Sequence, residues 1–433
     1  MLYNGNPRAN KETPMPEYKL TPEGKVLLPM NDGTEQAFIV TEELVPSYTL
    51  NDPLVMMNGR RVVSAQDWQQ RREELLGLFE EHVFGKTPTI PYTVTTETTE
   101  DWSPAFDGTA QRKQIKLILS TEYGSHAAEM LLYAPLVEQA VPAFLGLNFR
   151  GNQTIEPDPK ILITHTWVRD NPTTMDHHAT EISRGASDSR WPVKMLLKEG
   201  FALATIYYGD FDPDFDDGFQ NGLHAIFTPP GHHRQDNEWG AIGAWAFGLS
   251  RALDVLEQEP VINSRKVTVI GHSRLGKTAL WAGAQDQRFF AVVDNESGCG
   301  GSALNKRCFG ENVKAITKQF PHWFCKNYSQ YSDNEAAIPM DTHGLLALTA
   351  PRPLYVASAA EDQWSDPRGM YLAQKAAAPV YEFLGEPGIP MQTFPALSAT
   401  DVTGRQAYHI RPGKHDLTLF DWTQYVRFIQ QHL

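Results

Sequence analysis

The chain has 433 residues, of which 41% are hydrophobic and 21% charged, a composition typical of a folded globular protein with a large core. Its formal charge is −14, from 38 Lys and Arg against 52 Asp and Glu, which argues against nucleic acid or an anionic membrane surface as a partner. The sequence has no apolar run long enough to span a bilayer, and no signal peptide is visible. Its three cysteines are too few for a disulfide scaffold, and whether two of them pair stays open.

The first third of the chain combines an irregular arm with a helix and several strands. Residues 1–50 are rich in proline and lack a clear period, so we expect an extended arm packed on a single domain of residues 51–433. A helix is predicted within residues 64–85, with Ser64 as its N-cap. The strands that follow are predicted at residues 92–99, 112–120, 129–135 and 141–152.

Residues 152–190 show no regular hydrophobic pattern. A long irregular insertion in a compact domain is usually a functional loop. We therefore expect this insertion to serve the function of the protein.

From residue 200 onward, strands alternate with helices. The predicted strands are residues 201–210, 266–273, 289–297 and 352–362. The predicted helices are residues 238–259, 274–286 and 421–433. This alternation predicts an α/β fold with a mostly parallel sheet covered on both faces.

The stretch from Gly271 to Thr278, GHSRLGKT, has two interpretations. Its letters match the G-x-x-x-x-G-K-T pattern of a phosphate-binding loop, and the next apolar strand reaches Asp294, as a magnesium-binding strand would. More than half of the chain precedes this stretch, however, and no further nucleotide-handling motif follows. A nucleotide hydrolase is therefore the minor alternative.

In the second interpretation, Ser273 is the nucleophile of a serine hydrolase. It lies between a predicted strand and a predicted helix, as in the G-x-S-x-G elbow, although the second glycine comes one position late, at Gly276. In doubly wound hydrolases the acid and then the histidine follow the serine along the chain. Asp362 and His415 fit that order. Either Asp294 or Glu296, in the loop after the next strand, is an alternative acid.

Other polar residues near these motifs have structural interpretations. His409 alternates like a strand residue, His343 is a possible helix cap, and Glu361 is expected to be solvated. Trp191, Trp239 and Trp323 belong either to the core or to the cleft, and the sequence does not choose between the two.

The run GHSRLGK followed by NESGCGG resembles the glucuronoyl esterases, carbohydrate esterase family 15, in their bacterial form. The family signature is G-x-S-R-x-G-K, and His272 stands where fungal members carry cysteine. Further segments resemble the family in order along most of the chain, among them FLGLNFRGN, YYGDFDPDFDDG, FPHWF and HIRPGKHDLT. The resemblance implies an α/β-hydrolase fold: a three-layer αβα sandwich with a mostly parallel central sheet and bacterial-type loop insertions.

The resemblance also implies an activity. The enzyme would hydrolyse esters of (4-O-methyl-)glucuronic acid, as in lignin–carbohydrate ester links to glucuronoxylan, through an acyl-enzyme and without a metal or cofactor. It would be a secreted or periplasmic monomer. Another carbohydrate serine esterase, such as an acetyl-xylan esterase, is the alternative.

Catalytic roles follow from the same resemblance. Ser273 would be the nucleophile and His415 the base. Glu296 and Asp362 both match positions where members carry the triad acid, so the working acid stays open. Arg274 would stabilise the oxyanion through its backbone N–H and its guanidinium.

Binding roles follow as well. Lys277, Glu311 and Trp364 match positions that hold the sugar ring. The 152–190 insertion resembles extra loops around the active site, and we expect it to form one wall of the cleft.

The acidic run GDFDPDFDDG raises the question of a calcium site. Asp212, Asp214 and Asp216 have the spacing of an EF-hand loop, but Asp217 and Leu223 stand where that loop needs glycine and glutamate. We therefore expect a turn with solvated or arginine-paired aspartates and no bound metal.

Overall fold

The computed structural model describes residues 19–30 and 33–433, so residues 1–18 and 31–32 of the predicted arm lie outside the described residues. Its α-helices are α1 (Ala65–Phe79), α2 (Val193–Lys198), α3 (Gly222–Phe227), α4 (Ala241–Leu256), α5 (Arg274–Gln285), α6 (Val313–Gln319), α7 (Thr342–Ala347), α8 (Pro367–Phe383) and α9 (Leu419–His432). Its strands are β1 (Val26–Pro29), β2 (Glu35–Phe38), β3 (Thr93–Ala105), β4 (Ala110–Thr121), β5 (Gly124–Pro135), β6 (Val141–Asn148), β7 (Thr174–Met175), β8 (His178–Ala179), β9 (Ala202–Tyr207), β10 (Ile262–His272), β11 (Ala291–Asn295), β12 (Leu354–Ala359) and β13 (Gln406–Arg411).

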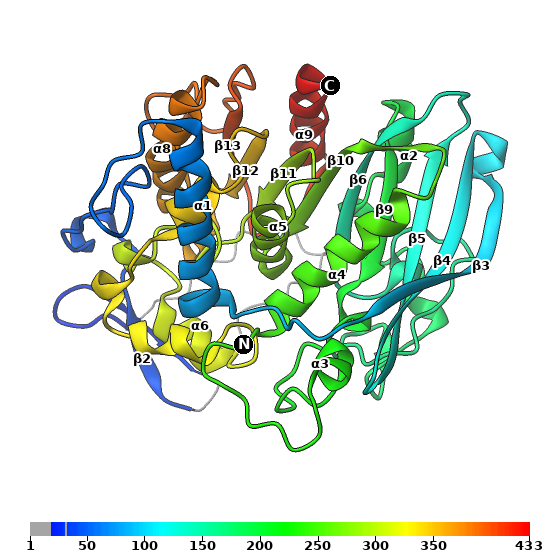
Figure 1. Cartoon of the computed structure of the whole chain (residues 1–433), viewed down its shortest axis with the longest axis horizontal. Coiled ribbons are helices and arrows are strands. Elements are labelled where there is room, and N and C mark those ends of the chain that lie inside the picture. The colour runs from blue at the N-terminus through cyan, green and yellow to red at the C-terminus, as the bar shows by residue number, and fades with distance from the viewer. Residues whose placement is uncertain (1–18, 31–32) are drawn as a thin grey trace.

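A nine-stranded sheet runs through the molecule in the order β13-β12-β11-β10-β6-β9-β5-β4-β3. The pairs from β13 to β9 are parallel, whereas β5, β4 and β3 continue the sheet in antiparallel fashion. Figure 1 shows β3 and β4 at one side of the molecule and β12 and β13 toward the other. The sheet is thus mostly parallel at its centre, as the alternation of strands and helices predicted.

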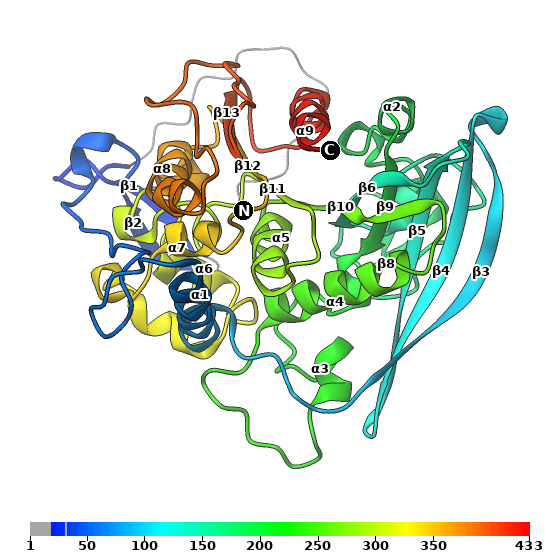
Figure 2. The same ribbon diagram turned by 45° about the horizontal axis from the view of Figure 1, so that its top comes forward.

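Helices cover both faces of this sheet. Because successive strand residues point to opposite faces, Val269 joins the core under α4, α5 and α8, while its neighbour Ile270 joins the core under α2 and α9. Figure 2 shows α2 and α9 on one side of the sheet and α4 and α5 on the other. The architecture is the three-layer αβα sandwich of the α/β-hydrolase fold.

The expected N-cap of the first helix is present. The Ser64 hydroxyl accepts a hydrogen bond of 3.1 Å from the backbone N–H of Asp67, and α1 starts at the next residue after Ser64. Trp68, Leu75 and Phe79 are the buried apolar residues of this helix, at the spacing expected of one helical face.

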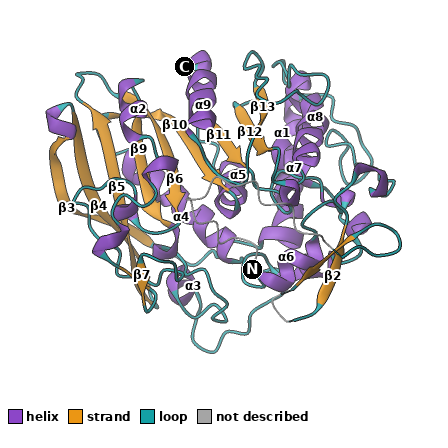
Figure 3. Cartoon of the chain, turned by 180° about the vertical axis from the view of Figure 1, so that it is seen from behind, coloured by secondary structure: helices purple, strands orange, loops and turns teal. Residues whose placement is uncertain are grey.

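The N-terminal hairpin and the 152–190 insertion lie on opposite sides of the molecule, as β2 and β7 show in the lower part of Figure 3. The β1–β2 hairpin comes from the N-terminal arm, and Ile39 beyond it forms a parallel bridge with Phe309. The 152–190 insertion is largely irregular, with only the short β7–β8 hairpin and three single-turn helices. Among the described residues, no helix is long and apolar enough to cross a membrane.

Candidate active site

Ser273 occupies a sharp turn between β10 and α5, two elements that lie near the middle of Figure 1. Its backbone has φ 59° and ψ −127°, a conformation that non-glycine residues rarely adopt. Such a conformation costs about 1–3 kcal/mol, and the surrounding structure must hold it. The turn directs the serine away from the regular strand, as expected of a nucleophile elbow.

Two glycines make this turn possible. A Cβ at Gly271 would lie 1.8 Å from the carbonyl oxygen of Leu275, and one at Gly276 would lie 2.3 Å from Oδ1 of Asp294. The second glycine therefore comes late because the first turn of α5 packs directly on Asp294 of β11. This packing explains the G-x-S-x-x-G spelling without a phosphate ligand.

His415 lies beside the turn that carries Ser273, in the loop between β13 and α9. Its ring centroid is 4.4 Å from that of His272, the residue immediately before Ser273. His272 is itself fixed through Nδ1, which is 2.5 Å from Oδ1 of Asn295. The base and the nucleophile predicted from opposite ends of the C-terminal half are thus brought together.

Both candidate acids reach the same nitrogen of His415. Nδ1 is 2.6 Å from Oδ2 of Asp362, after β12, and 3.1 Å from Oε2 of Glu296, after β11. Nδ1 thus faces the carboxylates, and Nε2 lies on the opposite edge of the imidazole ring. Both candidate acids thus contact the imidazole, and which of them is the working acid stays open.

The carboxylates change the electrostatics of the base. Burial by itself lowers the pKa of His415, but the hydrogen bonds and charges of Asp362 and Glu296 raise it to about 9. Burial raises the pKa of Glu296 to about 7, although His415 and Arg411 act in the opposite direction. The imidazolium form of the base is therefore strongly stabilised, as a mechanism that creates this cation requires.

Arg411, which sequence reasoning did not find, fixes the loop that carries the base. Its guanidinium donates to Oε1 of Glu296 at 2.7 Å and to Oδ2 of Asp421 at 2.9 Å. The backbone N–H of Asp416 in turn donates to Oε2 of Glu296 at 3.1 Å. Glu296 thus ties the histidine loop to the sheet as well as contacting the histidine.

Arg274 begins α5, so its backbone N–H lies at the helix N-terminus, where unpaired N–H groups favour negative charge. Its guanidinium forms an ion pair with the buried carboxylate of Asp214 and lies 4.6 Å from the ring centroid of Trp323. This pairing matches the expectation of arginine-paired aspartates in the acidic run. Asp212 of the same run pairs with His224, while Asp216 is exposed.

The three sugar-binding candidates also lie close together. Lys277 is buried and donates from Nζ to the carbonyl oxygen of Ser297, and burial lowers its pKa while the charge of Glu311 counteracts this. The backbone N–H of Glu311 donates to the carbonyl oxygen of Trp364 at 2.9 Å. The Trp364 ring meets the Phe38 ring edge-on, with centroids 4.8 Å apart. The N-terminal hairpin therefore supports this side of the site.

Two other histidines have structural partners. His409 lies in β13, where Nε2 is 2.8 Å from Oδ1 of Asp421 and Nδ1 is 2.9 Å from the Tyr355 hydroxyl. His343 lies within the first turn of α7 and contacts the carbonyl oxygen of Asn51 at 2.8 Å, whereas Asp341 caps that helix. The interpretation of His343 as the cap is therefore wrong.

The phosphate-loop interpretation of residues 271–278 is also wrong. Lys277 points to the carbonyl oxygen of Ser297, and the Asp294 carboxylate accepts hydrogen bonds from the hydroxyls of Ser297 and Ser302. The carboxylate that magnesium would need is thus engaged inside the protein. Asp294, one of the alternative acids, is accordingly a structural group under α5.

All three tryptophans left open by the sequence belong to the core. Trp191 lies in one hydrophobic cluster, and Trp239 and Trp323 lie in the other. Trp323 is also buried, but its ring packs on the Arg274 guanidinium.

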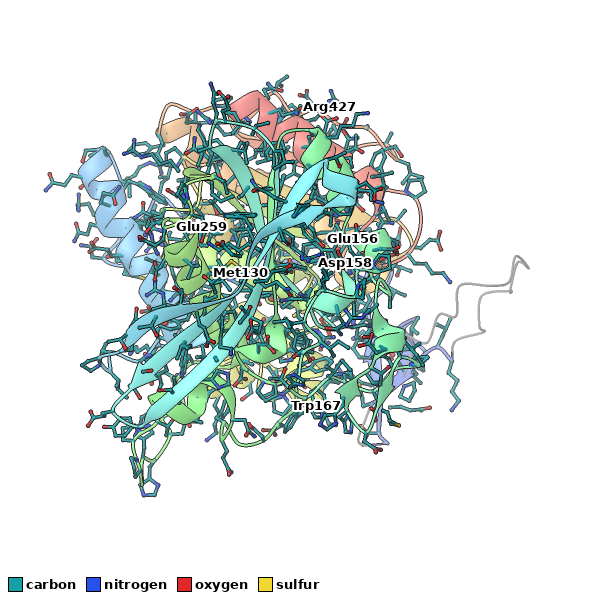
Figure 4. All side chains as sticks on the ribbon, turned by 90° about the vertical axis from the view of Figure 1, so that its right-hand side faces the viewer. Met130, Glu156, Asp158, Trp167, Glu259 and Arg427 are labelled. Carbon is teal, nitrogen blue, oxygen red and sulfur yellow. The ribbon has the colours of Figure 1, made fainter. Side chains whose placement is uncertain are left out.

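A cavity of about 340 Å³ adjoins the Arg274 side of the site. The 152–190 insertion contributes Trp167 and Arg169 to its wall, and Figure 4 shows Trp167 at the end of the molecule opposite Arg427 of α9. The remaining lining residues are Asp214, Phe215, Asp216, Gln319, Phe320, Pro321 and His322. The insertion thus forms one wall of a partly aromatic cavity.

Known proteins resemble this chain in sequence and in structure. A family model described as "Glucuronyl esterase, fungi" matches residues 230–385. Carbohydrate esterase MZ0003, from an unknown prokaryotic organism, is 44% identical over 407 residues, which cover 92% of this chain and 93% of that protein. A 4-O-methyl-glucuronoyl methylesterase 1 from Wolfiporia cocos is 27% identical over 379 residues, covering 83% of this chain and 79% of that protein.

Solved structures agree with these relatives. A structure described as a promiscuous CE15 esterase from a marine bacterial metagenome has a TM-score of 0.86 at 44% identity, covering 92% of this chain and all of that one. A glucuronoyl esterase from Solibacter usitatus has a TM-score of 0.83 at 42% identity, covering 90% of this chain and 99% of that one. The chain belongs to carbohydrate esterase family 15, the glucuronoyl esterases, and is a carboxylic ester hydrolase.

Proposed function

We propose that this enzyme hydrolyses esters of (4-O-methyl-)glucuronic acid by a serine mechanism. The observation that carries the proposal is the contact of His415 with two carboxylates beside the strained turn at Ser273. Nε2 of His415 takes the proton of Ser273, whose oxygen attacks the C6 carbonyl carbon. The imidazolium, stabilised by the carboxylates, then protonates the departing alcohol, and water repeats the two steps on the acyl-enzyme.

Arg274 stabilises the negative oxygen that develops during the attack. Its backbone N–H stands directly after the nucleophile at a helix start, and its guanidinium supplies positive charge. Lys277 and Glu311 bind the sugar hydroxyls, and the Trp364 ring packs on the C–H face of the sugar.

The alcohol side of the ester occupies the cavity walled by the 152–190 insertion. Its aromatic side chains suit an aromatic alcohol, so we propose that the natural alcohol belongs to lignin and that the acid is carried on glucuronoxylan. Because such polymers lie outside the cell, we propose that the enzyme is secreted or exported to the periplasm.

The acid specificity is tested by comparing kcat/KM for benzyl glucuronate with that for an aryl acetate. The proposal expects the glucuronate ester to be preferred, and Glu311→Gln to weaken hydrolysis of the glucuronate ester alone. A preference for the acetate that survives Glu311→Gln would support a general carbohydrate esterase, a candidate favoured by the promiscuous relative.

The alcohol side is tested with Trp167→Ala, using Trp102→Ala as the control because Trp102 is also a half-buried tryptophan, in β3. We expect Trp167→Ala to raise KM for benzyl glucuronate more than for methyl glucuronate. Equal effects on the two esters would refute contact between the insertion and the alcohol.

A further inference from the structure

We propose that Asp214 is a positioning residue that holds the Arg274 guanidinium at the reacting carbonyl. The inference rests on the proposed role of Arg274 in stabilising the oxyanion. Asp214 lies 59 positions before the nucleophile, in the turn after β9, and belongs to no catalytic motif of the sequence.

One carboxylate oxygen of Asp214 receives the arginine. Oδ2 forms the ion pair with Nη1 of Arg274, and it also accepts hydrogen bonds from the Tyr208 hydroxyl at 2.7 Å and from Arg169 at 3.1 Å. Nε of Arg274 is buried and has no hydrogen-bond partner among the described residues. Asp214 is therefore the anionic partner of the guanidinium, which otherwise contacts the Tyr208 hydroxyl and aromatic rings such as that of Trp323.

The other oxygen fixes Asp214 itself. Oδ1 accepts hydrogen bonds from Nε1 of Trp323 at 2.7 Å and from the His322 ring at 3.0 Å. Trp323 also stacks its ring against the guanidinium of Arg274. The Asp214 carboxylate and the Trp323 indole thus both contact the Arg274 guanidinium, and a hydrogen bond joins the carboxylate to the indole.

The Asp214 side chain is fully buried, with 0% exposure, yet it stays ionised. Burial alone would raise its pKa, but the charge of Arg274 and the hydrogen bond from His322 hold the pKa below its usual range. Removing this charge would leave the guanidiniums of Arg169 and Arg274 together without their shared counter-ion. The two guanidiniums would then repel each other and Nη1 of Arg274 would lose its partner, so the Arg274 side chain could leave its position.

A buried anion has two opposite effects on catalysis. It weakens the positive potential of Arg274, which slows the reaction, and it fixes the geometry of Arg274, which accelerates it. We expect geometry to dominate, because an oxyanion donor acts only within about 2.7–3.1 Å of the developing charge.

The test is a double-mutant cycle with Asp214→Asn, Arg274→Gln and the double variant, assayed on benzyl glucuronate. Asp214→Asn is expected to lower kcat at least about tenfold with KM nearly unchanged, since the lost interaction belongs to the transition state. In the Arg274→Gln background, the same change is expected to have no further effect on kcat.

Two further variants keep the test decisive. Asp212→Asn changes another buried aspartate of the same turn, one that pairs with His224, and it should leave kcat unchanged. Tyr208→Phe removes one hydrogen bond to Oδ2 and keeps the charge. It should lower kcat a few-fold in the parent and not in Arg274→Gln, even if Asp214→Asn fails to fold.

The outcomes separate the inference from the proposed function. If Arg274→Gln keeps full activity, the oxyanion role of its side chain fails. If Arg274→Gln is impaired but Asp214→Asn raises kcat, leaves it unchanged or lowers it equally in both backgrounds, the positioning role of Asp214 is overturned and the oxyanion role stands.

Discussion

The two carboxylates at His415 are not equivalent at the scale of single residues. Asp362 makes the shorter contact with Nδ1, 2.6 Å against 3.1 Å for Glu296, and Glu296 is also held by Arg411 at 2.7 Å. We therefore expect Asp362 to orient the base, and Glu296 to fix the loop and add charge.

Replacing these acids separates the two roles. Asp362→Asn should lower kcat by more than Glu296→Gln, but by less than the roughly 10⁴-fold loss known for a lone triad aspartate, because the second acid remains. The double variant should lose more than the product of the single losses. Kinetics on benzyl glucuronate decides this, and a larger loss for Glu296→Gln would reverse the assignment.

The pH dependence follows from the same contacts. Only neutral His415 can accept the proton of Ser273, and the neighbouring acids raise its pKa to about 9. Glu296→Gln removes one negative charge, which lowers that pKa, so the acidic limb of the kcat/KM profile should move to lower pH. A limb that stays in place or moves to higher pH would contradict the charge role of Glu296.

Sequence order was sufficient to predict that His415 and the two candidate acids lie together, because each follows a strand at the same edge of the sheet. The catalytic roles of these residues and of Ser273 stay predictions. Asp214 and Arg411 could not be predicted in this way. Their partners, Arg274 and Glu296, lie 60 and 115 positions away, and such ion pairs leave no local pattern.

At the scale of elements, the β1–β2 hairpin supports the sugar-binding side. The buried Phe38 ring meets Trp364, and the Ile39 carbonyl accepts a hydrogen bond of 2.7 Å from Gly310, next to Glu311. The division of the chain into an arm of residues 1–50 and a domain of residues 51–433 stays a prediction.

Phe38→Ala tests this support. Loss of the ring leaves space beside Trp364, so KM for benzyl glucuronate should rise while kcat changes little, and unfolding free energy should fall by about 3–5 kcal/mol. Phe428→Ala in α9 is a matched control, because it removes a buried phenylalanine from the other face of the sheet. An equal rise in KM for both variants would show a general loss of stability instead.

Element prediction succeeded where the hydrophobic period was long and failed for short helices. Helices α2, α3, α6 and α7 have only 6 or 7 residues, too few for a period to show. The 17-residue helix α8 was also missed, because Pro367 and Pro379 disguise its pattern.

For the whole molecule, alternating strands and helices were enough to predict the fold class. They did not predict the strand order, since β9 pairs with β5 in antiparallel fashion although the 152–190 insertion separates the two strands in the sequence.

The net charge of −14 favours a monomer, because two copies of the chain repel each other. Light scattering should give the mass of a single 433-residue chain, and twice that mass would contradict a monomer.

The serine mechanism is tested most directly by hydrolysis of benzyl glucuronate by the parent enzyme and by Ser273→Ala. We expect kcat to fall by about 10⁶-fold, as in other serine triads, while the folded state and substrate binding persist. Ser125→Ala, at an exposed serine of β5, serves as the control and should keep parental activity. A Ser273→Ala variant that retains even a tenth of the parental kcat would contradict a mechanism built on this hydroxyl.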